Sequence, residues 1–141
     1  MFKKILINVM FLGSIIFIIN LTMLPDPSLD IGIGSGGVNL IPFHSIGGWI
    51  SHQSLRDFIV NNIGNVVLFI PFGFMLPLRS KKVNRLSKSL LIGMLFSIVI
   101  ELVQLTMPNR WTDIDDVILN TLGAGIGYIL FTWLINIQKK I

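Results

Sequence analysis

Residues 89–107 read SLLIGMLFSIVIELVQLTM, an apolar stretch in which Glu101 is the one ionisable side chain. An α-helix rises about 1.5 Å per residue, so about 20 residues cross the roughly 30 Å hydrocarbon core of a bilayer. Backbone polar groups in lipid need partners inside their own segment, and a helix supplies them. The stretch is therefore predicted to be a transmembrane helix that carries one acid.

Three further segments have the same character. Residues 5–24, 58–78 and 117–137 are long, apolar and free of charged side chains. The whole chain of 141 residues is 52% hydrophobic and 13% charged, with a mean hydropathy of +0.79, whereas soluble domains average about 25% charged residues. We predict an all-α polytopic membrane protein with four transmembrane helices in a single domain over residues 1–141.

The first apolar segment has the basic flank of a signal peptide. Its apolar run of about 20 residues is longer than the apolar region of a typical signal peptide, and no small-residue cleavage motif follows it. We therefore expect residues 5–24 to be an uncleaved span.

Basic residues fall mainly on one side of this predicted bundle. That side carries Lys3, Lys4, Arg79, Lys81, Lys82, Arg85, Lys88, Lys139 and Lys140. The other side carries Arg56 and Arg110 among six aspartates. The positive-inside rule then places both termini in the cytoplasm and the loops 25–57 and 108–116 outside. Basic residues in this pattern act as topology signals, so nucleic-acid binding is not expected.

The long outer loop between the first two spans contains two distinct parts. DIGIGSGGVNL at 30–40 holds Gly32, Gly34, Gly36 and Gly37, which predicts a flexible hinge. Residues 48–60 combine Trp49 with an apolar helical face, so we expect an outer interfacial segment leading into the second span.

Metal-binding residue patterns are weak in this sequence. His44 and His52 are eight residues apart, which is not a ligand spacing on one helix, and the chain has no cysteine. A hard-cation site would need several of the acids Glu101, Asp113, Asp115 and Asp116 to converge. We predict no metal and no cofactor.

Polar residues recur at helical spacing inside the spans, where each needs a partner or a function. The third span carries the stripe Gly93, Ser97, Glu101 and Gln104, and the fourth carries Asp116, Asn120, Gly123 and Gly127. In the second span, Asn65 and Gly73 share a face and Pro71 should kink the helix. Gly123 and Gly127 form a G-x-x-x-G pattern typical of close helix packing.

These stripes predict an outward-facing polar pocket near one membrane surface. Its candidate residues are Asn65, Ser97, Glu101, Gln104, Arg110, Asp113, Asp116 and Asn120. Arg110 is expected to pair with Glu101 or with the aspartates. The same residues also fit a structural network that holds the bundle together. No nucleophile–base pair or catalytic motif is apparent, so no catalytic residue is assigned.

The motifs resemble those of the VanZ-like family. NVVLFIPFG at 65–73 resembles its second-span signature, NLIPF at 39–43 is similar to its outer-loop element, and the polar pattern of the third and fourth spans also matches. The resemblance implies a small multi-pass protein of the bacterial cytoplasmic membrane. It also implies an association with resistance to glycopeptide antibiotics, teicoplanin in particular.

Pocket and resemblance together lead to two hypotheses. In the first, the pocket binds an amphiphile or lipid headgroup at the cell envelope and so modulates susceptibility to teicoplanin-type glycopeptides. In the alternative, the chain is an intramembrane enzyme acting on a lipid-linked or cell-wall precursor, with Glu101 as acid or base and Arg110 holding an anionic headgroup. Expected partners are membrane lipid and either that precursor or the antibiotic. A proton pathway through Glu101 is a third reading, and the oligomeric state is not predicted.

Overall fold

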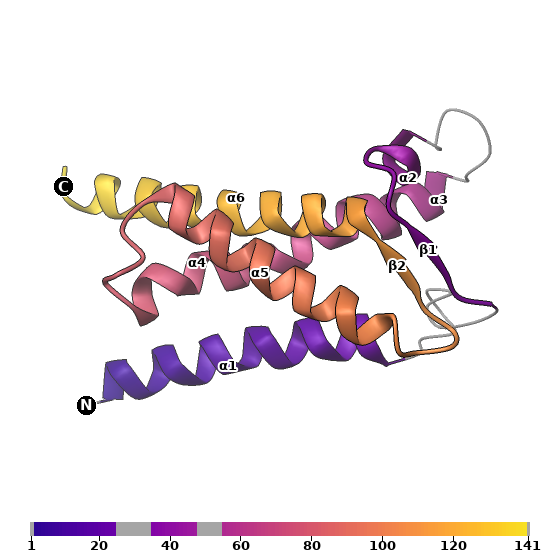
Figure 1. Ribbon diagram of the computed structural model, residues 1–141. Helices are drawn as coiled ribbons and strands as arrows, with labels where there is room; N and C mark the ends of the chain where they lie inside the picture. The colour runs from indigo at the N-terminus through magenta and orange to yellow at the C-terminus, as the bar shows by residue number, and fades with distance from the viewer. Residues whose placement is uncertain (1, 25–34, 48–54, 141) are drawn as a thin grey trace.

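A computed structural model of the chain describes residues 2–24, 35–47 and 55–140. Its four long helices are α1 (Phe2–Met23), α4 (Gly64–Arg79), α5 (Leu86–Gln104) and α6 (Ile114–Gln138), shown in Figure 1. A short helix α3 (Leu55–Phe58) and a π-helical segment (Ile59–Ile63) lead directly into α4. Within the described residues, four helical segments are long and apolar enough to cross a membrane. The predicted all-α architecture with four spans is confirmed.

The helix ends differ by a few residues from the predicted span limits. The helix α5 ends at Gln104 instead of continuing to residue 107. The helix α6 starts at Ile114 because Asp113 caps it, its side chain accepting a hydrogen bond of 2.9 Å from the N–H of Asp115. Asp115 and Asp116 therefore belong to the first turn of the last helix.

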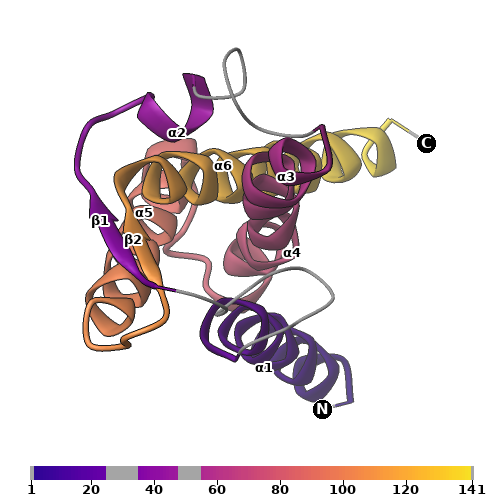
Figure 2. The same ribbon diagram turned by 90° about the vertical axis from the view of Figure 1, so that its right-hand side faces the viewer.

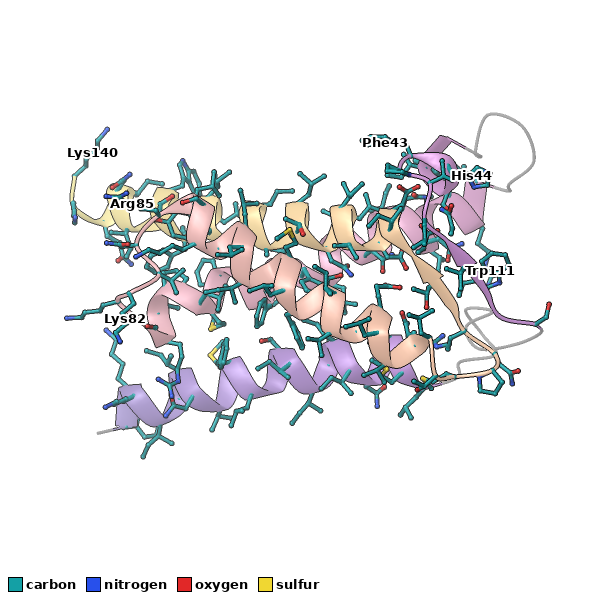
Figure 3. The ribbon with its side chains drawn as sticks, viewed as in Figure 1. Phe43, His44, Lys82, Arg85, Trp111 and Lys140 are labelled. Carbon is teal, nitrogen blue, oxygen red and sulfur yellow. The ribbon has the colours of Figure 1, made fainter. Side chains whose placement is uncertain are left out.

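The two ends of the bundle differ in character. The described chain begins and ends on the same side as the connection between α4 and α5. Figure 3 shows Lys82, Arg85 and Lys140 at this end, which we call the basic end. Phe43, His44 and Trp111 lie at the opposite end, which we call the strand end.

The strand end is named for a two-stranded parallel sheet (Figure 2). Strand β1 (Gly37–Asn39) pairs with β2 (Trp111–Asp113), with Asn39 opposite Asp113, and the short helix α2 (His44–Gly47) follows β1. The hinge expected at Gly36 and Gly37 is wrong. A Cβ at Gly36 would lie 2.3 Å from the carbonyl oxygen of Arg110, so these glycines allow the two strands to approach. Gly32 and Gly34 lie outside the described residues.

The helices expose apolar side chains and bury polar ones, which is the opposite of the pattern in a soluble protein. On α5, Leu91, Leu95 and Val99 are at least half exposed, while Ser89 and Ser97 are fully buried. The apolar core contains an aromatic cluster, in which the ring centroids of Phe72 and Phe96 lie 5.0 Å apart at a tilt of 37°. Lipid would cover the exposed apolar faces, so the polar stripe of α5 is turned toward the other helices.

Helices α4 and α6 pack backbone against backbone. A Cβ at Gly73 would lie 2.1 Å from the carbonyl oxygen of Ala124, and Cβ atoms at Gly123 and Gly127 would lie 2.2 Å from carbonyl oxygens of α4. Only glycine fits at these three positions. Pro71 is exposed within α4, which continues as one helix to Arg79.

Candidate functional site

The predicted polar residues gather at the strand end, where α5 stops and β2 leads into α6. The carboxylate of Glu101 accepts a hydrogen bond of 2.8 Å from the backbone N–H of Asp113. The hydroxyl of Thr112 donates to the carbonyl oxygen of Glu101 at 3.3 Å. Glu101 is only 6% exposed, so the last turn of α5 is fixed to β2 from inside the bundle.

Asp113 and Asp115 anchor the segment that follows β1. Asp113 accepts hydrogen bonds from the Asn39 amide at 2.8 Å and from the Ser45 hydroxyl. Asp115 is fully buried and accepts backbone N–H bonds from Phe43 at 2.5 Å, Ser45 at 2.8 Å and Ile46 at 3.1 Å. We call these two aspartates the loop clamp. N–H and O–H donors of the segment 39–46 thus surround both carboxylates.

The clamp imposes an unusual backbone at Phe43. This residue has a φ of +65°, the left-handed region that costs a non-glycine residue about 1–2 kcal/mol. Its side chain is 64% exposed, so packing does not offset that cost. The hydrogen bonds to Asp115 hold the turn in place.

Arg110 and Gln104 attach α1 to the rest of the bundle. The Arg110 guanidinium donates from Nη2 to the carbonyl oxygens of Thr22 and Leu21, and Gln104 Nε2 donates to Thr22 at 2.9 Å. These carbonyls lack helical partners because they lie in the last turn of α1. Arg110 was expected to pair with Glu101 or with the aspartates, but in the described part of the chain it donates to carbonyls of α1 and forms no ion pair with these acids.

Electrostatic coupling between Arg110 and the acids persists without direct contact. Burial lowers the pKa of the Arg110 guanidinium from its ordinary value, and the charges of Asp116 and Glu101 act to raise it. Arginine stays protonated in proteins, so Arg110 keeps a half-buried positive charge at the strand end.

Two side-chain pairs lie deeper in the bundle. Asn65 donates from Nδ2 to Asp116 at 2.7 Å, which joins α4 to the first turn of α6. One turn further, Asn120 donates from Nδ2 to the Ser97 hydroxyl at 2.9 Å, which joins α6 to α5. Both pairs are built from residues that the helical spacing placed on facing stripes.

Three buried side-chain atoms of the described residues have no hydrogen-bond partner: Gln104 Oε1, Arg110 Nε and Asn120 Oδ1. All three residues belong to the predicted pocket set. Buried polar groups in proteins are nearly always hydrogen-bonded. These three atoms therefore retain unused hydrogen-bonding capacity inside the bundle.

The structure gives no support for a metal-ion site formed by the acids of the third and fourth spans. Within the described residues, no three His, Asp or Glu side chains are grouped so as to hold a metal ion. His44 is exposed at the strand end. His52 and Trp49, the latter central to the predicted interfacial segment, lie outside the described residues.

Sequence reasoning missed part of the site. Asp115 was not among the pocket candidates, although it is the most buried acid of the described residues, and neither were its partner Ser45 and the Asn39 that contacts Asp113. One signal was available: DIDD at 113–116 concentrates three acids beside a single arginine. Such a group needs other donors, and in the structure the backbone N–H groups of Phe43, Ser45 and Ile46 supply them.

Fold and site define a small multi-pass membrane protein with a buried polar cluster at one end of its helices. The sequence model of the VanZ/LLP1 family matches residues 6–136. The chain is 34% identical over 94 residues to Protein VanZ of Enterococcus faecium, a match covering 67% of this chain and 52% of that protein. The chain therefore belongs to the VanZ-like family, and it spans about half the length of this curated relative. No solved structure matches.

Proposed function

We propose that this chain resides in the bacterial cytoplasmic membrane and lowers susceptibility to teicoplanin-type glycopeptides. It does so by binding an amphiphile or lipid headgroup at the strand end, which faces outward. The resistance part rests on kinship with Protein VanZ and on the association of the family. The outward orientation rests on the positive-inside rule, since the basic end carries the lysines and arginines of the termini and of the α4–α5 connection.

The observation that carries the binding part is the trio of unpartnered buried atoms, Gln104 Oε1, Arg110 Nε and Asn120 Oδ1. A buried polar group without a hydrogen bond costs about 1–3 kcal/mol. A headgroup placed among these atoms would supply the missing partners. Exposed apolar side chains on the same helices, such as Leu102 and Val103, are suited to contact its acyl chains.

The enzymatic alternative has less support. A general acid or base must reach the atom on which it acts. One oxygen of Glu101 is occupied by the N–H of Asp113, and Nη2 of Arg110 is occupied by carbonyls of α1. Both side chains hold the strand end together, which favours a binding role.

Susceptibility measurements test the proposal. The chain is expressed in a susceptible strain, and the inhibitory concentrations of teicoplanin and vancomycin are compared with those of an empty vector. We expect a severalfold rise for teicoplanin and little change for vancomycin. Asn120→Leu should abolish the rise, whereas the control Lys139→Gln, at the basic end, should preserve it at equal membrane abundance.

No change for either antibiotic would contradict the resistance part. Mass spectrometry of membrane lipids and wall precursors from the same cells tests the alternative. A new or missing lipid species that depends on Glu101 would replace binding by catalysis.

A further inference from the structure

Four consecutive apolar side chains are exposed at the strand end. Residues 40–43 read LIPF, and we call them the apolar turn. The side chains of Leu40, Ile41 and Phe43 are 70%, 65% and 64% exposed, and Pro42 is exposed as well. An exposed apolar patch of this kind marks a surface that contacts lipid or another protein.

The sequence around the apolar turn is free of charge. Between Asp30 and Arg56 the chain contains no lysine, arginine, aspartate or glutamate. A charged side chain is costly within a bilayer, and this stretch carries no such cost. The absence of charge therefore favours lipid over water as the surroundings of the turn.

The backbone of this segment is also largely satisfied without water. From residue 41 to residue 47 every backbone N–H has a hydrogen-bond partner in the protein, and Pro42 has no N–H. Asp115 accepts three of these bonds, the Asn39 side chain accepts a fourth, and carbonyl oxygens of the same segment accept the other two. Unpaired polar groups exclude irregular backbone from lipid. The apolar turn can therefore lie against lipid without leaving these donors unpaired.

The loop clamp fixes the turn at the level of a membrane boundary. Asp115 bonds Phe43 and lies in the first turn of α6, a helix of 25 residues. Such a helix is about 38 Å long, against a hydrocarbon core of about 30 Å, so its ends reach the headgroup regions. Seen from the strand end, the chain between β1 and α2 runs along the outer edge of the bundle (Figure 2). Phe43 lies on the flank of the molecule beside the beginning of α6 (Figure 3).

We propose that the apolar turn inserts into the interfacial region of the leaflet at the strand end and anchors the buried polar cluster at a fixed depth. Its partner is bilayer lipid, whose upper acyl chains contact the exposed apolar side chains. The loop clamp transmits the position, because Asp113 holds the segment after β1 and also donates its N–H to Glu101. Trp111, 60% exposed at the same end, is of the residue type enriched at membrane interfaces. This inference goes beyond the proposed function and does not depend on it.

Spin labels detected by electron paramagnetic resonance test the insertion. Because the chain has no cysteine, Leu40→Cys and Ile41→Cys can each carry a single nitroxide label in phosphatidylcholine–phosphatidylglycerol vesicles. Collisions of the label with oxygen, which concentrates in lipid, are compared with collisions with a water-soluble nickel chelate. We expect both labels to favour oxygen. The lipid control is Leu102→Cys, on the exposed apolar face of α5, and the water control is the exposed Asn109→Cys.

Two results would overturn the proposal. If either label in the apolar turn favours the nickel chelate as Asn109→Cys does, the turn faces water. If either label is poorly accessible to both reagents, a protein surface covers the turn, which is a second copy of the chain or another partner.

Hydrogen–deuterium exchange in lipid nanodiscs tests the anchoring role without a label. The variant Leu40→Ser/Ile41→Ser removes two exposed apolar side chains and keeps the backbone N–H groups and Asp115. We expect exchange of the amides at 41–47 to accelerate severalfold. The control Leu91→Ser/Leu95→Ser removes a similarly exposed pair from α5 and should leave exchange at 41–47 as in the wild type.

Unchanged exchange in the turn variant would show that the loop clamp alone holds the segment, and would contradict the anchoring role. Neither measurement involves a bound ligand or an antibiotic. A chain that leaves glycopeptide susceptibility unchanged would therefore contradict the resistance part of the proposed function and leave the membrane anchor standing.

Discussion

Arg110 donates its Nη2 hydrogen bond to the carbonyl oxygen of Thr22, so a half-buried guanidinium caps the end of α1. Cations stabilise helix C-termini by roughly 0.3–1 kcal/mol at exposed sites and by more when partly buried. Of the residues on α1, only Ser14 and Ile18 are buried. We therefore expect α1 to depend more on this polar attachment at the strand end than the other three spans do, because they bury more of their own side chains.

Replacing Arg110 by Met should loosen the end of α1. The variant removes the donor to Thr22 and Leu21 while keeping an unbranched apolar stem. Hydrogen–deuterium exchange of the amides at 20–24 should accelerate, with α4 and α6 unaffected. Arg85→Met, at the basic end, is the matched control. Unchanged exchange at 20–24 would show that apolar packing alone holds α1.

Replacing Asp115 by Asn should release the segment after β1. The carboxylate accepts three backbone N–H bonds, and an amide offers one acceptor oxygen for them. We expect a loss of about 1–3 kcal/mol in local stability, read as faster exchange at 39–47. Asp116→Asn, which keeps its acceptor for Asn65, should leave exchange at 39–47 as in the wild type. Equal effects of both variants would contradict a specific loop clamp.

Replacing Gly73 by Ala should destabilise the bundle. The new Cβ would lie 2.1 Å from the carbonyl oxygen of Ala124, so α4 and α6 must separate. Overpacking of this kind costs about 1–3 kcal/mol. Gly13→Ala is the control, because nothing lies within 4 Å of its added Cβ. Thermal unfolding in detergent measures both variants, and equal midpoints would rule out the close packing described.

The sequence predicts the main features of the helices because membrane burial leaves a periodic signal. The spacing of Ser97, Glu101 and Gln104 indicated one shared face, and the structure buries all three. The partners of Arg110 and Asp115 could not be predicted in the same way. They are backbone groups about 70 to 90 residues away in the sequence. Every residue except proline carries the same backbone N–H and C=O groups, so the sequence does not indicate which of them is the partner.

The strands were also beyond sequence reasoning. Each of β1 and β2 has three residues. A segment of this length is too short to show the alternation of apolar and polar residues that predicts a strand. Their pairing depends on tertiary context. Glycines at 36 and 37 were therefore interpreted through their flexibility, whereas the structure uses their lack of a side chain.

The proposed orientation can be checked directly because the chain contains no cysteine. Single cysteines are introduced at Asn109, near the strand end, and at Ser87, near the basic end. A membrane-impermeant thiol reagent added to intact cells should label Asn109→Cys and spare Ser87→Cys until the cells are opened. The reverse pattern would place the strand end in the cytoplasm.

The most direct test of the central claim is native mass spectrometry of the chain purified from bacterial membranes. The double variant Ser97→Ala/Asn120→Leu removes both partners of one buried pair, and such paired replacement is close to neutral for stability. We predict that the wild type retains a bound amphiphile and that the folded double variant does not. Equal amphiphile occupancy in both proteins would contradict a binding site at the strand end.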